Sequence, residues 1–277
     1  MQSAPSAAAR IVPTGGRGIA RDRLRVAAAY GERYRLARDA ATRALAEASK
    51  PRDGFRDDRV SVVADLAAVY LYLTGEWAWL DEGMSGGTPG PHLPLARCVA
   101  SGLRRLPLFR GPAIVRTSAD EPVAEWYGEK RFVTERSFWG ASAPVGGIGG
   151  PGFLVWSLTA RSTAALDASV PDRVVFMPGT RFKVLRVTDG GQPLVLMREL
   201  FPPELAQDDP SGSNGSGTAW LDESTRAELE RAVTGPRAAT EPYVLASADM
   251  VGPRARPPGL RWTKGASDEP VGEALPR

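Results

Sequence analysis

Hydrophobic positions follow a helical spacing through the first part of the chain. Between residues 22 and 48, apolar side chains recur near every third or fourth position among strong helix formers, and Gly31 is a point where such a helix can break. Residues 60–80 carry the clearest amphipathic pattern, which Gly75 divides in two. These spacings predict a helical first part of the chain.

The pattern changes after one more helical segment. Residues 93–106 keep the helical spacing and stop at Pro107, which disfavours a helical conformation in the residue before it. From there to residue 200 the apolar residues come in short β-branched or aromatic runs bounded by Gly, Pro, Asp and Ser, as strands and turns do. The predicted strands are 108–115, 153–158, 174–176, 182–187 and 194–197.

These patterns divide the chain into three parts. Residues 1–18 are small, polar and rich in Gly and Pro, so we expect a flexible tail. Residues 19–205 form the domain, with a helical part at 19–106 and a strand-rich core at 107–205. Residues 206–277 are a linker followed by a Pro/Gly-rich C-terminal extension. Helices leading into a run of strands are typical of the α+β class.

The extension contains one segment with helical potential. Residues 208–217, Asp-Asp-Pro-Ser-Gly-Ser-Asn-Gly-Ser-Gly, have the composition of a flexible linker. After them, residues 221–233 are predicted to form a short helix with Ser224 or Asp222 as its N-cap.

Composition excludes several kinds of site. The 35 basic and 32 acidic side chains give the 277 residues a net charge of only +3, which does not describe a nucleic-acid-binding face. One cysteine, Cys98, allows no internal disulfide, and one histidine, His92, leaves too few ligands for zinc and no histidine relay. No apolar run reaches the ~20 residues of a membrane span, and no signal-peptide core is present. We expect a cytoplasmic protein, or an exported effector without a recognisable signal.

Five segments between residues 60 and 200 form an ordered series of motifs. They are VYLYLTGEWAWL at 69–80, an amphipathic helix, Leu-Pro and a strand closing on an arginine at 93–116, FWGAS at 138–142, VVFMPGTRFKV at 174–184, and a closing strand at 194–200 that ends in Glu-Leu. In this order they resemble the mono-ADP-ribosyltransferases of the arginine-serine-glutamate class.

The resemblance implies a fold and a chemistry. The expected fold is α+β, with N-terminal helices followed by two small β-sheets packed at an angle and NAD in the cleft between them. The reaction of that family cleaves the nicotinamide–ribose bond through an oxocarbenium-like transition state, and a protein nucleophile then attacks the ribose. Such a site needs a cation for the pyrophosphate, a hydroxyl for the ribose and a carboxylate for the developing positive charge.

The motifs match only in part. Arg116 stands at the arginine that closes the first strand in the family, and Thr117 follows where a glycine is frequent. In the central motif Gly140 and Ala141 replace the first serine and the threonine, which leaves Ser142. By this resemblance, the residues predicted to contact NAD are Arg116, Thr117, Trp139 and Ser142.

The catalytic carboxylate is where the chain departs most from the family. Counting back from the Pro-Gly-Thr turn, the family glutamate falls on Arg173, whose guanidinium would repel the oxocarbenium charge. Losing a preorganised electrostatic group costs about 10²- to 10³-fold in rate, and reversing its sign costs more. A one-residue bulge would instead bring Asp172 into the pocket, so Asp172 is the candidate catalytic residue. Glu135 and Glu199 are the other acids near the motifs.

Three hypotheses follow. The first is a bacterial ADP-ribosyltransferase-like protein whose catalytic motifs are degenerate, a pseudoenzyme that binds NAD or a protein partner with weak or no transferase activity. The second is an active, divergent NAD-dependent transferase, with a protein target, or an NAD glycohydrolase. The third is an unrelated α+β interaction protein.

Overall fold

The architecture is taken from a computed structural model of the chain. It describes residues 18–47, 59–75, 78–85, 90–116, 127, 132–143, 151–188, 193–201, 204, 218–234 and 258. The tail predicted at 1–18, apart from Gly18, and the linker predicted at 208–217 lie outside the described residues.

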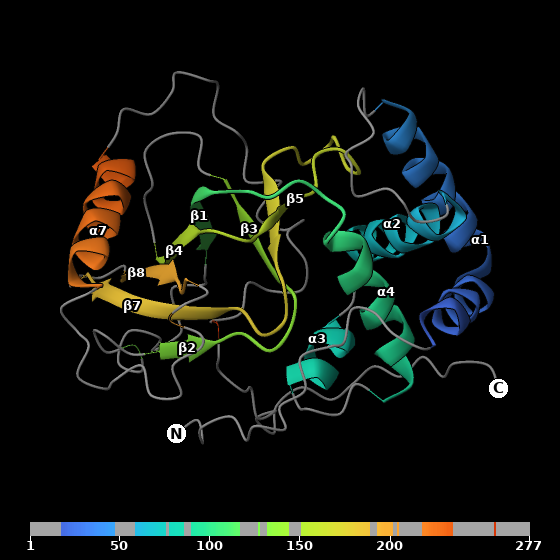
Figure 1. Ribbon diagram of the computed structural model, residues 1–277, viewed down its shortest axis with the longest axis horizontal. Helices are drawn as coiled ribbons and strands as arrows, with labels where there is room; N and C mark the ends of the chain where they lie inside the picture. Colours follow the sequence, from blue (N-terminus) through green and yellow to red (C-terminus); the bar gives the residue numbers. More distant parts are fainter. Residues whose placement is uncertain are drawn as a thin grey trace.

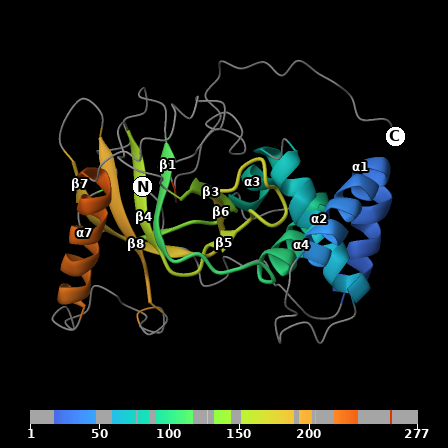
Figure 2. The ribbon, with the colours of Figure 1, turned by 90° about the horizontal axis from the view of Figure 1, so that it is seen from above.

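Helices form a layer on one side of the molecule (Figures 1 and 2). They are α1 (Ile19–Glu47), α2 (Arg59–Thr74), α3 (Ala78–Ser85), the short 3₁₀ helix η1 (Gly90–His92) and α4 (Leu93–Leu103). The two predicted breaks are confirmed: Gly31 has a non-helical φ of 44° inside α1, and α2 ends just before Gly75. The predicted helix at 93–106 ends three residues early, because the N–H groups of Arg105 and Leu106 bond three residues back, to Gly102 and Leu103.

One buried carboxylate joins three of these helices. Asp65 of α2 is fully buried and accepts two hydrogen bonds of 2.8 Å from Arg23 of α1. It also accepts one of 2.8 Å from the Ser101 hydroxyl and one of 3.2 Å from Arg105. Since α1 is otherwise rich in exposed arginines, Arg23 differs from its neighbours in pointing inward to a partner.

The close approach of α4 to α2 requires a glycine. A Cβ added to Gly102 would lie 2.3 Å from the backbone oxygen of Asp65 and 2.6 Å from a methyl carbon of Val69. No side chain fits at this point without moving the two helices apart.

Eight strands follow the helices and form one hydrogen-bonded sheet in the order β2-β7-β8-β4-β1-β3-β6-β5. Their bounds are β1 Gly111–Arg116, β2 Phe132–Thr134, β3 Trp139–Ser142, β4 Gly152–Ser157, β5 Arg161–Ser162, β6 Arg173–Phe176, β7 Arg181–Val187 and β8 Leu194–Glu199. All neighbours are antiparallel except β4 and β8. The structure confirms an α+β fold with N-terminal helices.

The sheet is nearly divided between β1 and β3. Only one residue pair, Ile114 with Ser142, joins these strands, so five strands lie on one side of the junction and three on the other. Both parts contribute to a single apolar core, in which Trp139 of β3 contacts Phe153 of β4 and Phe182 of β7, with ring centroids 6.1 and 5.4 Å apart. The two parts therefore pack against each other as two small sheets, although a hydrogen-bonded pair still connects them.

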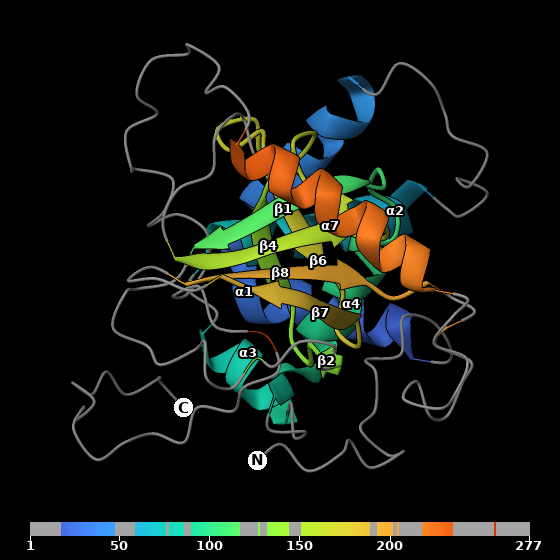
Figure 3. The same ribbon diagram turned by 90° about the vertical axis from the view of Figure 1, so that its left-hand side faces the viewer.

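A last helix, α7 (Ala219–Thr234), crosses the strands on the side away from the helical layer (Figures 2 and 3). It confirms the helix predicted at 221–233 but begins two residues earlier. The predicted N-cap is therefore wrong: Ser224 and Asp222 both lie inside the helix. The hydrogen bond from the Asp222 N–H to the Thr218 carbonyl shows that the first turn is already formed there.

Candidate functional site

The motif residues of β3 and β6 share one face of the sheet. Ser142 is paired with Arg173, and Gly140 with Val175, in a regular antiparallel ladder. Because side chains alternate along a strand, these four residues face away from the core that holds Trp139. Val175 packs into the core of the helical layer, so this face is the one that the helices cover.

Arg173 is buried on this face and fixed by two groups. Its side chain is only 4% exposed, and Nη1 lies 3.1 Å from a carboxylate oxygen of Asp167. The same nitrogen donates to the Leu73 carbonyl, 3.3 Å away, in the last turn of α2. Carbonyls at a helix C-terminus lack intrahelical partners and carry partial negative charge, so they favour a cation. Arg173 is thus a buried, paired cation at the residue for which the resemblance predicts a carboxylate.

Asp172, the candidate catalytic acid, precedes this ladder. Its backbone oxygen accepts a hydrogen bond of 2.8 Å from the Ala143 N–H, so regular pairing continues past Ser142 and Arg173. The β3–β6 ladder contains no bulge that would bring Asp172 onto the face of Arg173. One oxygen of its half-buried carboxylate, Oδ1, is buried and has no hydrogen-bond partner among the described residues.

Arg116, the predicted pyrophosphate ligand, is the exposed last residue of β1. Its side chain points to the same face of β1 as that of Ile114, two residues earlier, and Ile114 pairs with Ser142. On the neighbouring strand β4, Arg116 lies opposite Gly152. A Cβ added to Gly152 would lie 2.3 Å from the Val115 oxygen, and its φ of 157° also disfavours other residues. The backbones thus approach closely beside Arg116. Thr117, the next predicted contact, lies outside the described residues.

Trp139 is the predicted NAD contact that the structure places elsewhere. Its side chain is 4% exposed and packs in the core between the two parts of the sheet, against Phe153, Phe176 and Phe182. It faces away from Ser142 and Arg173. In this position its ring packs in the core between the two parts of the sheet, where large aromatic side chains are commonly buried.

Tyr72 has a polar environment that the motifs did not predict, with charges from Asp81, Glu135 and Arg173 acting on its hydroxyl. The Tyr72 ring contacts Phe138, with centroids 5.1 Å apart, and its hydroxyl lies 3.5 Å from the Phe138 carbonyl. Burial, the charges of Asp81 and Glu135 and a hydrogen bond with Asp81 raise the pKa of Tyr72 well above 10, against the opposing charge of Arg173. Since Tyr72, Asp81 and Glu135 come from α2, α3 and the end of β2, no sequence spacing reveals their convergence.

The two acids left over from the motifs both hold turns. Glu135 accepts hydrogen bonds from the N–H groups of Arg136 and Ser137 and from the Ser137 hydroxyl, at 2.9, 2.7 and 2.6 Å. Glu199 accepts the Leu158 and Thr159 N–H groups at 2.7 and 2.9 Å, together with the Thr159 hydroxyl. These bonds fix both carboxylates in place.

The remaining candidates lie in the helical layer. His92 packs on Trp79, with ring centroids 3.7 Å apart, and lines a half-open cavity of about 280 Å³ with Arg25 and Tyr30. Burial lowers the pKa of His92. Over the described residues, no three His, Cys, Asp or Glu side chains are grouped to hold a metal ion.

The helices were also compared with the length and polarity that a membrane-spanning helix requires. Within the described part of the chain, every helix is too short or too polar to cross a bilayer.

Comparison with known proteins was informative only at the level of structure. No protein-family profile and no curated sequence matches the chain. The structure of the type III effector XopAI from Xanthomonas axonopodis pv. citri matches with a TM-score of 0.52 and 19% identity, over 69% of this chain and 90% of that one.

Weaker structural matches include two further bacterial proteins. HopU1 of Pseudomonas syringae pv. tomato, an ADP-ribosyltransferase, gives a TM-score of 0.44 at 12% identity over 61% of this chain and 98% of that one. Exoenzyme S from Pseudomonas aeruginosa, in complex with human 14-3-3 protein beta and bound to carba-NAD, gives 0.42 at 12% identity over 68% and 98%.

These identities bear on fold alone. The helical layer, the mixed sheet and the match to XopAI agree with the fold that the resemblance predicted. The protein has an ADP-ribosyltransferase-like fold.

Proposed function

We propose that the protein is an ADP-ribosyltransferase-fold binding module that binds NAD or a protein partner and cleaves NAD weakly or not at all. One observation supports this proposal: the guanidinium of Arg173 is buried and held by Asp167 and the Leu73 carbonyl. By the motif resemblance, we take this to be the position of the family's catalytic carboxylate.

The electrostatic argument is direct. Breaking the nicotinamide–ribose bond builds positive charge on the ribose, and a carboxylate stabilises that charge while a guanidinium opposes it. Gly140, opposite Val175 on the same face, also offers no hydroxyl for the ribose. Among the described residues of this face, Ser142 is the motif position that still carries a hydroxyl, and the motif position expected to carry the carboxylate holds Arg173.

Binding is a separate matter from cleavage. Arg116 is exposed at the end of β1, and its side chain points to the same face of the strand as Ile114, which pairs with Ser142. An exposed cation in this position suits the proposed role of holding a pyrophosphate. We therefore propose NAD as a ligand, with Arg116 and Ser142 as contacts. Thr117 remains a proposed contact on the resemblance alone, and Trp139 is proposed to support the site from the core instead of touching the ligand.

Calorimetric titration with NAD tests the binding. Arg116→Ala should weaken the affinity by about 1.5 to 3 kcal/mol, the range for a hydrogen bond to a charged group. Arg110→Ala, which removes another exposed arginine just before β1, should leave the affinity unchanged. An affinity that is the same in Arg116→Ala and the unmodified protein would remove Arg116 from the site.

Release of nicotinamide from labelled NAD tests the cleavage. We expect none above the rate without protein. The double variant Arg173→Glu, Asp167→Asn restores a carboxylate and removes the repulsion from Asp167, and we expect it to release nicotinamide measurably. Turnover by the unmodified protein at or above the rate of the double variant would contradict the proposal.

A second candidate function rests on Asp172. Its buried Oδ1 has no hydrogen-bond partner among the described residues, so this oxygen is available to a ligand hydroxyl. An active transferase or NAD glycohydrolase using Asp172 would lose turnover in Asp172→Ala. Asp167→Ala also removes an acid from this region without touching Asp172, and its effect would separate a catalytic role from a general effect of charge.

The proposal also covers a protein partner and the place where the protein acts. We propose that the module acts by contacting another protein, either in the cytoplasm or after export. Affinity capture from bacterial and from host-cell extracts, each compared with the Arg116→Ala variant, would show in which setting a partner is bound.

A further inference from the structure

The helix α7 covers a second apolar face, over strands β1, β4 and β8 (Figure 3). The face consists of Ile114 of β1, Leu154 of β4, and Leu194 and Leu196 of β8, and Leu229 of α7 completes this cluster. Among the described residues of α7, only Thr225 and Leu229 are buried, while Trp220 in its first turn is 68% exposed. The apolar contact of α7 is therefore small for a helix of 16 residues.

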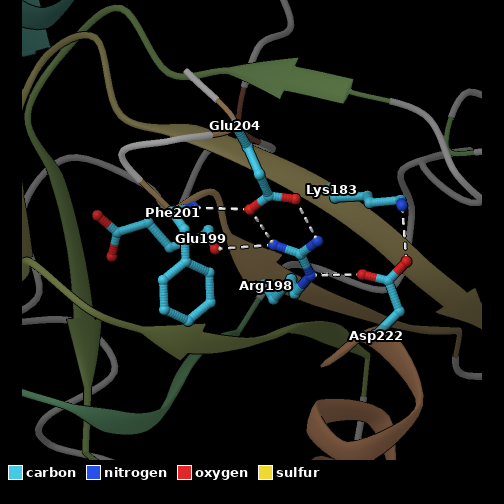
Figure 4. Close-up of polar contacts among 6 residues, drawn as sticks. All are labelled: Lys183, Arg198, Glu199, Phe201, Glu204 and Asp222. Atoms are coloured by element: carbon cyan, nitrogen blue, oxygen red, sulfur yellow. Dashed lines mark hydrogen bonds and ion pairs between the residues drawn. The ribbon is translucent and has the colours of Figure 1, made fainter. Parts of the chain in front are cut away.

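Besides the partly buried Ala232 and Val233, charged groups also join α7 to the strands (Figure 4). Arg198 of β8 is fully buried and its Nε lies 2.5 Å from a carboxylate oxygen of Asp222. Lys183 of β7 contacts the other oxygen of Asp222 at 2.6 Å. Further along, Arg186 contacts Glu230 at 3.0 Å. The strands thus present three cations to an acidic side of α7.

The same guanidinium also holds the chain before α7. Arg198 makes two hydrogen bonds to Glu204, of 2.8 and 2.6 Å, and Glu204 also accepts the Phe201 N–H at 2.8 Å (Figure 4). Glu204 and Asp222 are therefore both attached to one side chain, whereas a segment of 13 residues, 205–217, connects Glu204 to Thr218. A segment of that length can span about 45 Å when extended. The contacts of α7 with Arg198, Lys183, Arg186 and the apolar cluster are therefore the described ones that position it.

We propose that α7 is a removable cover on a helix-binding face, and that this face takes an acidic amphipathic helix of a protein partner in place of α7. The occupant is defined by α7 itself: a carboxylate for Arg198 and Lys183, a leucine two turns later for the apolar cluster, and a second acid for Arg186. Interfaces that are small and polar are typical of contacts that open and close. The inference does not depend on the chemistry at Arg173.

In a binding experiment, α7 competes with any added helical peptide for the face that it covers, because α7 belongs to the same chain. A helix on a short flexible connection has an effective concentration of about millimolar, so it suppresses weaker free ligands. A free helix with the same contacts should bind well only when the tethered copy is disabled. The double variant Asp222→Lys, Leu229→Asp in the full chain does this, because it reverses the charge opposite Arg198 and places a carboxylate against the apolar cluster.

The probe is a fluorescein-labelled peptide of residues 219–234, followed by fluorescence anisotropy. We expect saturable binding to the double variant and binding at least about 10²-fold weaker to the unmodified protein, the ratio set by the tethered competitor. The same peptide carrying Leu229→Asp is the control and should not bind. Absence of peptide binding to a double variant with an unchanged circular dichroism spectrum, or equal binding to both proteins, would overturn the proposal.

Hydrogen exchange on the unmodified protein keeps the test independent of how the variant folds. The amides of α7 should exchange through local opening, at least tenfold faster than those of β8. If α7 and β8 exchange together in one global step, α7 is an integral part of the fold and the proposal fails.

A second copy of the chain is the competing occupant. Mixing the single variants Arg186→Cys and Glu230→Cys would give a disulfide-linked dimer if α7 exchanges between chains. Monomers in that mixture support a partner of another kind, and a cross-linked dimer would overturn the assignment to such a partner.

Discussion

Removing the carboxylate of Asp65 tests what holds the helical layer together. In Asp65→Ala, Arg23 loses two hydrogen bonds, and Ser101 and Arg105 lose one each. Asp65 is fully buried, while the side chains of Arg23 and Arg105 are 15% and 14% exposed, so two cations are left at the boundary of the core without this partner.

The magnitude follows from that geometry. Breaking a buried ion pair by removing one partner costs about 3 to 5 kcal/mol. Because water can reach the two guanidinium groups in part, we expect a loss near the lower end, about 3 kcal/mol in the free energy of unfolding. For a domain of this size that corresponds to a fall in melting temperature of about 6 to 12 °C.

The assay is urea unfolding followed by far-ultraviolet circular dichroism. Glu32→Ala is the matched control, since it removes another acid paired with an arginine on α1, but both partners are more than 60% exposed, and its midpoint should not change. A double-mutant cycle with Arg23→Met should show coupling of at least about 1 kcal/mol. Equal midpoints for Asp65→Ala and Glu32→Ala would refute the view that Asp65 joins the three helices.

Three further predictions concern single groups. Burial, together with the charges of Asp65 and Asp22, raises the pKa of the Cys98 thiol to about 12, so Cys98 should resist iodoacetamide at pH 8 until the protein is unfolded, as mass spectrometry would show. Burial opposes the ionisation of Glu204, but hydrogen bonds from Arg198 and Phe201 lower its pKa below the ordinary 4.5. A depressed pKa stabilises the fold above that value, so the stability difference between the unmodified protein and Glu204→Gln should be full at pH 7 and shrink as the pH falls below 4.5. Gly102→Ala should lower the free energy of unfolding by about 1 to 3 kcal/mol, measured with urea, because its Cβ would meet α2; an unchanged midpoint would mean that the helices move apart freely.

The helical part of the fold was predictable because its signals are local. Apolar spacing located α1, α2 and α4, and the glycines at 31 and 75 located two breaks. Ends were less predictable, since they depend on contacts from elsewhere. Asp222 has the chemistry of an N-cap, but its carboxylate pairs with Arg198 and Lys183 from distant strands, so the helix begins before it.

The candidate site was predictable only as a set of positions. Motif order selected Arg116, Ser142 and Arg173, and strand pairing turns their side chains to the same face of their strands. Trp139 was predicted to contact the ligand because it adjoins the motif, yet alternation along β3 turns it into the core. Asp167, which pairs with Arg173, lies in a turn whose position no periodicity describes.

The partners of Arg173 bear on how the site lost its family pattern. A glutamate replaced by arginine alone would leave a buried cation that costs several kcal/mol. Here that cost is offset by Asp167, which lies outside the family motifs, and by the Leu73 carbonyl at the end of α2. Restoring a glutamate alone would therefore set it against Asp167 and that carbonyl, and we expect Arg173→Glu to unfold at lower urea than Arg173→Glu, Asp167→Asn. If the single variant is as stable as the double variant, Asp167 does not serve to hold the side chain at position 173, and the argument from its pairing fails.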